Sequence, residues 1–213
     1  MSEIIEVECP GCGEMIKVNM NEFVDVVENP EYKAAIVEGD FFLNECPGCG
    51  DAVMVEYPVM YMDPSRGLNI YMAPDHEDDL LDQLNSLDIP DSDVDETAVY
   101  RLTACGVQLM EKILIAEGGR DDRIIELYKF IVWDSVKEEW PDLEEGDLLY
   151  MFEDDEEFLV VWPSDNGDGE KLTMDFDEEL YADLAENYTE IVSVPAGKYA
   201  EVNQSWIGER FER

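Results

Sequence analysis

Two identical five-residue motifs carry the clearest chemistry in this chain of 213 residues. Cys-Pro-Gly-Cys-Gly occupies residues 9–13 and again residues 46–50. The proline fixes φ for a turn that brings both sulfurs toward one point, and the last glycine permits a left-handed backbone that aims N–H groups at sulfur. Two such turns facing each other supply four thiolates, the ligand set of a closed tetrahedral zinc site. We therefore predict a structural Zn²⁺ bound by Cys9, Cys12, Cys46 and Cys49.

A site with four protein ligands leaves no position for water or substrate, so it indicates a structural role rather than catalysis. Zinc binding contributes roughly 10–16 kcal/mol in zinc-finger peptides, which would couple the metal directly to folding. The interval between the motifs is longer than in common zinc ribbons, but a strand, a short helix and another strand can return the second turn to the first. An alternative hypothesis is a thiol-redox or metal-responsive protein that uses the same cysteines.

Strand and helix patterns around the motifs indicate how the two turns meet. Stretches with period-two alternation enter and leave the motifs. The predicted strands are residues 4–7, 15–20, 41–43 and 52–57. We expect residues 23–27 to extend the second of these strands. Asn29-Pro30-Glu31 then has the residue types of a helix start, and Gly39 those of a helix end.

A second hairpin and an acidic connector follow. Residues 59–62 and 68–72 are predicted strands on either side of a segment rich in turn residues. The methionines of this region are expected to fill core space flexibly: Met54, Met60, Met62 and Met72. Residues 75–96 are strongly acidic and contain Pro90, so we predict a short amphipathic piece followed by an exposed connector.

A helical hairpin is predicted next. From Thr97, apolar residues recur at steps of three and four, with an interruption at Cys105-Gly106, until a pair of glycines ends the pattern. A second helix is predicted from residue 121 to residue 139. Two helices joined by a short glycine loop are expected to pack antiparallel.

The remainder, residues 140–213, is predicted to be a small α+β subdomain. Its expected strands are residues 147–152, 157–162, 171–176 and 191–194. Helices are expected after Asp177 and over residues 203–213. The acidic turn 165–170 is rich in oxygen ligands but lacks the loop length and terminal glutamate of an EF-hand, so we expect a solvated hairpin turn.

One polar cluster in the helical region carries charges of both signs. Asp121 and Asp122 suit a helix N-terminus, and Glu126 with Lys129 forms an i,i+3 pair. An ion-paired helix start explains these residues structurally. The alternative is an enzyme whose site includes Asp122, Arg123, Glu126 and Lys129. The chain has a single histidine, His76, and no recognisable P-loop or Ser-His-Asp set, so no catalytic residue is assigned.

The charge of the chain excludes several partners. Its 54 acidic residues against 13 Lys and Arg give a formal net charge of −41. Such a surface repels phosphate backbones and anionic lipid because it offers few cations to replace their counterions. We therefore expect a protein partner, with neither direct nucleic-acid binding nor a membrane. An acidic mimic of nucleic acid is a further alternative, and it requires carboxylates spaced along a ridge. The sequence names no small-molecule substrate.

Cysteine usage and the N-terminal residues predict a cytoplasmic protein. The start MSEIIEVEC has no basic or apolar region of a signal peptide, and no apolar run approaches the roughly 20 residues of a membrane helix. In a reducing compartment, Cys-x-x-Cys pairs are more often metal sites than disulfides. The fifth cysteine, Cys105, is expected to be a buried thiol.

The chain resembles the CpXC family, bacterial and archaeal proteins named for two Cys-Pro-x-Cys motifs. The resemblance covers most of residues 2–135 and is carried by both ECPGCG words, NPEYKAAIVEGDF, YPVMYMDPSRGLNIYMAP and YRLTACGVQLMEKILIAEGGRDDRIIELYK. The last stretch is similar to the family in its Glu-Lys pair and its Asp-Arg-x-x-Glu-x-x-Lys pattern, and YAEVNQSWIGERF looks like the tails of some members. The resemblance implies a metal site at the four motif cysteines and implies no activity.

We therefore predict an α+β protein built from a zinc-ribbon-like β module, a helical hairpin and a C-terminal subdomain. The expected modules are a CpXC-like part, 1–139, and an α+β part, 140–213. The first divides into a zinc-ribbon part, 1–74, a connector, 75–96, and a helical hairpin, 97–139. The expected function is that of a zinc-binding, non-enzymatic interaction protein.

Overall fold

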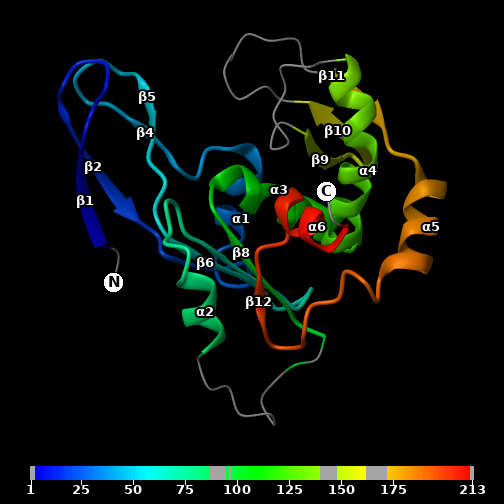
Figure 1. Ribbon diagram of the computed structural model, residues 1–213. Coiled ribbons are helices and arrows are strands. Elements are labelled where there is room, and N and C mark those ends of the chain that lie inside the picture. The colour runs from blue at the N-terminus through cyan, green and yellow to red at the C-terminus, as the bar shows by residue number, and fades with distance from the viewer. Residues whose placement is uncertain (1–2, 87–94, 96, 140–147, 162–171, 212–213) are drawn as a thin grey trace. The chain divides into compact units, whose positions relative to one another are not determined.

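The computed structural model describes residues 3–86, 95, 97–139, 148–161 and 172–211. Helices and sheets both occur in it, which confirms the α+β class (Figure 1). The chain forms two compact units: unit 1 is Met1–Met110 with Ala196–Ala200, and unit 2 is Glu111–Pro195 with Glu201–Arg213. The expected boundary between residues 139 and 140 stays a prediction, because residues 140–147 lie outside the described part.

Two β-hairpins in unit 1 carry the cysteine motifs, and we call them together the double hairpin. They are formed by β1 (Glu3–Glu8) with β2 (Met15–Met20), and by β4 (Leu43–Glu45) with β5 (Ala52–Met54). Both pairs are antiparallel. On β2, Ile16, Val18 and Met20 are buried while the alternate residues are exposed, so the predicted period-two pattern is confirmed.

Helix α1 (Pro30–Glu38) begins and ends where the sequence predicts, with Asn29 at the N-cap and Gly39 in the left-handed conformation at φ 83°. The Asn29 side chain makes no capping hydrogen bond. Strand β4 starts two residues later than predicted, because the backbone N–H groups of Asp40 and Phe41 donate to the carbonyl of Ala35 and close the helix end instead.

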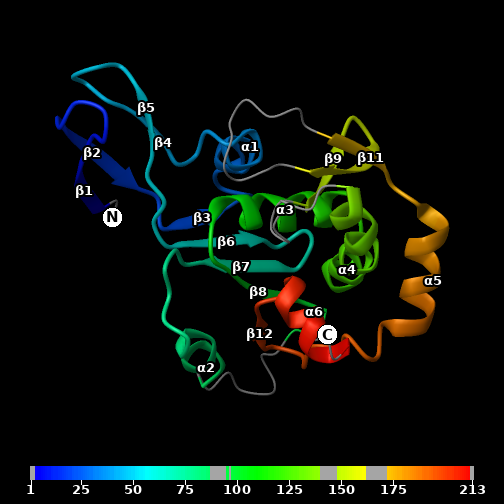
Figure 2. The ribbon, with the colours of Figure 1, turned by 45° about the horizontal axis from the view of Figure 1, so that its top comes forward.

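Unit 1 also contains a five-stranded sheet, in the order β12-β8-β7-β6-β3. Its strands are β3 (Phe23–Asp25), β6 (Val59–Asp63), β7 (Leu68–Met72), β8 (Val99–Thr103) and β12 (Tyr199–Ala200). The predicted β6–β7 hairpin is confirmed. Residues 23–25 do not extend β2 but run parallel to β6 at the sheet edge, as Figure 2 shows.

The predicted helix from Thr97 is wrong over residues 97–105, about its first two and a half turns. Residues 99–103 form strand β8, which pairs in parallel with β7. Valine, tyrosine and threonine favour strands, and the hydrogen bonds to β7 outweigh the helical spacing of the apolar residues. Gly106 therefore begins helix α3 (Gly106–Glu117) rather than interrupting a longer helix. Cys105 lies in the connection between the two elements and is half-buried.

The acidic connector begins with helix α2 (Leu80–Asn85), and residues 87–94 lie outside the described part. Asn85 fixes this helix to β12, since its side chain donates to the Tyr199 carbonyl at 3.0 Å and accepts from the Tyr199 N–H at 2.8 Å. Of the methionines expected in the core, Met72 is fully buried, but Met54 is 55% exposed. The core-filling prediction is therefore wrong for Met54.

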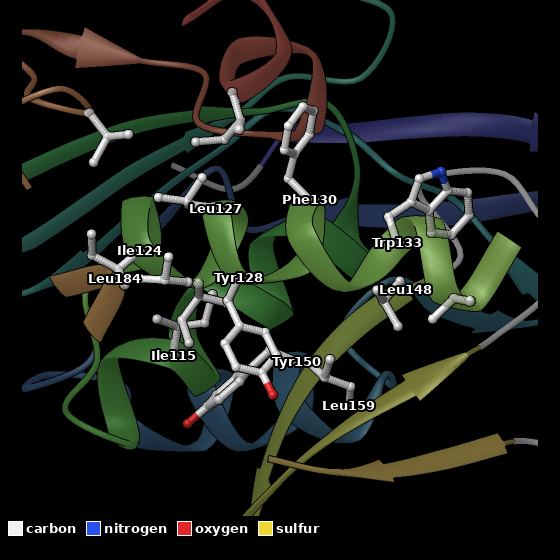
Figure 3. Close-up of a cluster of buried hydrophobic side chains, with 14 of the residues drawn as sticks. Ile115, Ile124, Leu127, Tyr128, Phe130, Trp133, Leu148, Tyr150, Leu159 and Leu184 are labelled. Atoms are coloured by element: carbon white, nitrogen blue, oxygen red, sulfur yellow. The ribbon is translucent and has the colours of Figure 1, made fainter. Parts of the chain in front are cut away.

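Unit 2 combines helices with a three-stranded antiparallel sheet in the order β11-β10-β9. Its elements are α4 (Asp122–Glu139), β9 (Leu148–Glu153), β10 (Glu156–Val161), β11 (Leu172–Asp175), α5 (Glu178–Tyr188) and α6 (Gln204–Phe211). Helix α3 is divided between the units after Met110. Figure 3 shows side chains of the hydrophobic core of unit 2, among them Ile124, Tyr128 and Tyr150.

Most predicted elements of unit 2 are confirmed. Asp177 caps α5, accepting hydrogen bonds from the N–H groups of Glu179 and Leu180. The predicted strand 191–194 is wrong, because these residues form a turn and an irregular segment. The acidic turn 165–170 lies outside the described residues. Among the helices that are described, none combines the length and the apolar composition of a membrane span.

Arg120 joins three parts of unit 2. Its guanidinium donates to both carboxylate oxygens of Glu157 on β10, at 2.6 and 2.5 Å, and to both carboxylate oxygens of Glu178 on α5. The rings of Phe176 and Tyr181 lie 5.3 and 4.7 Å from its central carbon. The planar guanidinium thus satisfies two carboxylates and two aromatic rings at once, which an ammonium group cannot do.

Arg120→Lys is expected to lower the free energy of unfolding of unit 2 by about 2 kcal/mol, because a lysine keeps the charge but loses the paired hydrogen bonds. All four tryptophans of the chain belong to unit 2, so tryptophan fluorescence during urea unfolding reports this unit. Glu178→Gln is the control: Glu178 is 63% exposed, so its removal should have less than about half that effect. Equal effects would show that the exposed Glu178 pair contributes as much as the Glu157 pair.

Candidate functional site

The first cysteine motif folds as a closed turn between β1 and β2. The N–H of Cys9 donates to the carbonyl of Glu14 at 2.9 Å, and the N–H of Gly13 donates to the carbonyl of Cys9 at 2.9 Å. Gly13 has φ 78°, in the left-handed region that residues with side chains rarely adopt. Cys9 is buried and Cys12 is exposed. The backbone role predicted for the last glycine of the motif is confirmed.

The second motif repeats the first between β4 and β5. The N–H of Cys46 donates to the carbonyl of Asp51, and that of Gly50 to the carbonyl of Cys46, both at 2.9 Å. Gly50 has the same φ of 78°, and the N–H of Gly48 points at the Cys46 sulfur at 3.4 Å. Each motif therefore presents its two sulfurs with the same backbone geometry.

The two turns approach each other closely at their middle glycines. A methyl group on Gly48 would lie 3.0 Å from the Glu14 side chain and 3.2 Å from the Cys12 sulfur. A methyl group on Gly11 would lie 3.1 Å from the Asp51 carboxylate. Each glycine thus faces the residue that directly follows the other motif. The absence of a side chain at these glycines lets the four sulfurs meet.

The four sulfurs form a compact group. Cys9 and Cys49 sulfurs are 3.8 Å apart, and Cys12 and Cys46 sulfurs are 3.6 Å apart. All four lie within 4.8 Å of one another, and all five cysteines of the chain are free. A tetrahedral ion with Zn–S bonds of about 2.3 Å separates its sulfurs by about 3.8 Å. The residues therefore fit a four-coordinate metal ion.

The electrostatics of the group favour a cation among the sulfurs. Backbone N–H groups of Cys49 and Gly48 lower the pKa of the Cys46 thiol to about 7. The pKa of Cys49 is raised: the Asp51 N–H lowers it, but the Asp51 carboxylate, burial and the neighbouring sulfurs outweigh that effect. Sulfurs this close resist ionising together, and a bound divalent cation removes that repulsion.

A second group of charged side chains lies inside unit 2, between α3 and α4. Glu126 is at its centre and is 2% exposed. Its carboxylate accepts from the Lys112 ammonium group at 3.0 Å and from that of Lys129 at 3.2 Å. The Gln204 side chain of α6 donates to the same carboxylate at 2.8 Å. The carboxylate is therefore held by three donors from three helices.

The network continues in both directions from Glu126. Lys112 also pairs with Asp122 at 3.2 Å. Lys129 also donates to Glu111 at 2.8 Å, and Glu111 accepts from the backbone N–H of Tyr150 at 2.7 Å. We call these five charged residues the buried network, and each of them is at most 8% exposed: Glu111, Lys112, Asp122, Glu126 and Lys129.

Burial acts differently on the two glutamates of the network. Burial raises the pKa of Glu126, but the ammonium groups of Lys112 and Lys129 outweigh it and hold that pKa below its ordinary value. Burial also raises the pKa of Glu111, and the attraction of Lys129 does not offset it. The two lysines thus favour the charged form of Glu126, whereas folding disfavours the charged form of Glu111.

The structure brings together three of the four residues of the predicted alternative enzyme site. Asp122, Glu126 and Lys129 belong to the buried network, whereas Arg123 pairs with Asp121 at 2.5 Å. Glu111 and Lys112 also belong to the buried network and are not among the predicted site residues. Their signal was an adjacent charged pair inside the apolar run LMEKILIA. His76 is half-buried and its Nδ1 lies 2.8 Å from the carbonyl of Ala73.

The described fold and site define an α+β protein with a four-cysteine cluster that can hold a metal ion. The family described as CpXC protein matches residues 7–129, which include all four cysteines and the whole buried network. The chain belongs to the CpXC family. No curated protein matches the chain, and no solved structure matches it either.

Proposed function

We propose that the protein binds one structural Zn²⁺ through Cys9, Cys12, Cys46 and Cys49, and that the double hairpin is a zinc ribbon used for protein interaction. The sulfur separations of 3.6 and 3.8 Å carry this proposal, because they match a tetrahedral four-thiolate ion. Soft thiolate ligands in this geometry favour zinc or iron, and zinc needs no redox partner. When bound, the ion neutralises thiolate charge and joins the two hairpins.

An interaction role is supported because the cysteine site does not suit catalysis and the charge of the chain does not suit nucleic-acid binding. Four protein ligands leave no coordination position for a substrate, so the ion holds structure and does not act on a bound molecule. The net charge of −41 opposes nucleic acid, which many zinc ribbons bind. A protein partner remains, and a reducing cytoplasm is the compartment that keeps the free cysteines reduced and able to bind a metal ion.

Metal analysis of the protein purified without added metal tests the proposal. We expect one zinc per chain, retained after treatment with a mild oxidant. Replacing it with Co²⁺ should give the visible absorption of a tetrahedral thiolate site. Iron instead of zinc would overturn the zinc assignment. Metal-free protein whose cysteines form disulfides under the same oxidant would overturn the structural site in favour of the thiol-redox alternative.

A further inference from the structure

The double hairpin exposes apolar side chains. Among the described residues, nine large hydrophobic side chains are exposed, and six of them lie between residues 4 and 54. Four belong to the double hairpin itself: Ile4, Met15, Leu43 and Met54. Single exposed apolar residues are ordinary on a protein surface, so the way they are arranged decides their meaning.

Leu43 and Met54 are direct neighbours on one face of the second hairpin. They are cross-strand partners of β4 and β5 and are 40% and 55% exposed. Glu45 and Ala52 form the next cross-strand pair on the same face, and both are exposed. We call these four residues the outer face of the second hairpin. Asn44 and Val53, which point the other way, are half-buried.

The cysteine site fixes this face in place. Cys46 follows Glu45 directly, and the N–H of Cys46 bonds to the carbonyl of Asp51, just before Ala52. Strands of three residues have little stability of their own, so β4 and β5 depend on the turn that joins them. A rigid apolar pair on a metal-held hairpin is suited to recognition, because little conformational entropy is lost on binding.

The charges around the face select the partner. Residues 3–22 and 40–57 contain one lysine and nine acidic residues: Glu3, Glu6, Glu8, Glu14, Glu22, Asp40, Glu45, Asp51 and Glu56. The one lysine, Lys17, lies 3.8 Å from Glu6. A second copy of this chain would bring the same negative charge and be repelled. Basic residues around an apolar core would complement the face.

We propose that the outer face of the second hairpin docks a protein segment whose apolar side chains are flanked by lysine or arginine. Leu43 and Met54 contact the apolar side chains, and Glu45 pairs with a basic group. This inference rests on the proposed function, since the zinc-held ribbon presents the face. It names the partner by its chemistry: a basic, amphipathic segment of another protein.

The test uses zinc-loaded full-length protein and a short fluorescent peptide of alternating leucine and lysine, followed by fluorescence anisotropy. We expect binding that weakens with added salt, and no binding of the peptide with glutamate in place of lysine. The double variant Leu43→Ser with Met54→Ser should weaken binding by roughly tenfold or more. The matched control, Ile131→Ser with Ile191→Ser, removes two exposed apolar residues of unit 2 and should leave affinity unchanged.

A second variant guards against misfolding. Glu45→Lys keeps both apolar residues but reverses the charge of the face. It should therefore weaken binding of the lysine peptide and allow binding of the glutamate peptide. Zinc content is measured for every variant. One zinc per chain with affinity unchanged in both face variants overturns the docking inference alone, whereas protein without zinc overturns the proposed function. Self-association that the Leu43 and Met54 changes abolish would assign the face to a second copy and overturn the basic partner.

Discussion

Cys46→Ser is expected to release the zinc ion that we propose the four cysteines bind, and to unfold the double hairpin while unit 2 stays folded. Cys46 is 1% exposed, and its backbone closes the second turn. A serine hydroxyl stays protonated at neutral pH and is a poor zinc ligand. Structural zinc contributes roughly 10–16 kcal/mol in comparable sites, which exceeds what two short hairpins gain from their own packing.

Two measurements separate the effects on the two units. Hydrogen exchange should rise over residues 3–20 and 43–54 and stay slow over helix α4. The tryptophan fluorescence of unit 2 should keep its native spectrum and its urea midpoint. Cys105→Ser is the matched control, because Cys105 lies outside the four-sulfur group and should keep zinc. A Cys46→Ser protein that retained one zinc and a protected double hairpin would contradict the four-thiolate site.

The cysteine site was predictable because its information is local. Proline and glycine set each turn within five residues, and the repeat of the motif pairs one turn with the other. The same holds for α1, whose start at Pro30 and end at Gly39 depend on backbone preferences of single residues. Where a residue's conformation is fixed by its sequence neighbours, the sequence alone is sufficient.

Strand β8 and the buried network show where prediction from sequence neighbours fails. Residues 99–103 have apolar spacing that fits a helix, and only pairing with the distant β7 makes them a strand. Similarly, the sequence around Glu126 and Lys129 predicts only an i,i+3 ion pair on one helix. Their burial depends on Lys112 from α3 and Gln204 from α6, which no local pattern links to them. Long-range partners set both features.

Lys129→Met is expected to lower the free energy of unfolding of unit 2 by about 3–5 kcal/mol. Methionine fills a similar volume but removes the ammonium group that lies between Glu111 and Glu126. Losing one partner of a buried ion pair leaves an uncompensated charge in a region of low dielectric, and this has a larger effect than the pair's own attraction. Urea unfolding followed by tryptophan fluorescence measures the change. Lys137→Met on the same helix is the control, because Lys137 is outside the network and should change stability little.

Two isosteric replacements distinguish the glutamates of the network. Glu126→Gln should destabilise unit 2 by an amount similar to Lys129→Met, because it removes the carboxylate that both lysines share. Glu111→Gln should destabilise unit 2 less than Glu126→Gln does. Burial raises the pKa of Glu111, so folding disfavours its charged form. A glutamine oxygen at this position can still accept from Lys129 and from the Tyr150 N–H.

The contributions of Glu111 and Glu126 to stability change with pH in opposite directions. The pKa of Glu111 is raised by folding, so its contribution is complete below its unfolded pKa of about 4.3 and is lost as the pH rises through the folded value. The pKa of Glu126 is lowered, so its contribution is present above about 4.3 and is lost as the pH falls. In Glu111→Gln, stability should therefore no longer fall as the pH rises through the folded pKa of Glu111. In Glu126→Gln, stability should no longer fall as the pH drops through the folded pKa of Glu126. Equal destabilisation by Glu111→Gln and Glu126→Gln would contradict the opposite pKa shifts of the two carboxylates.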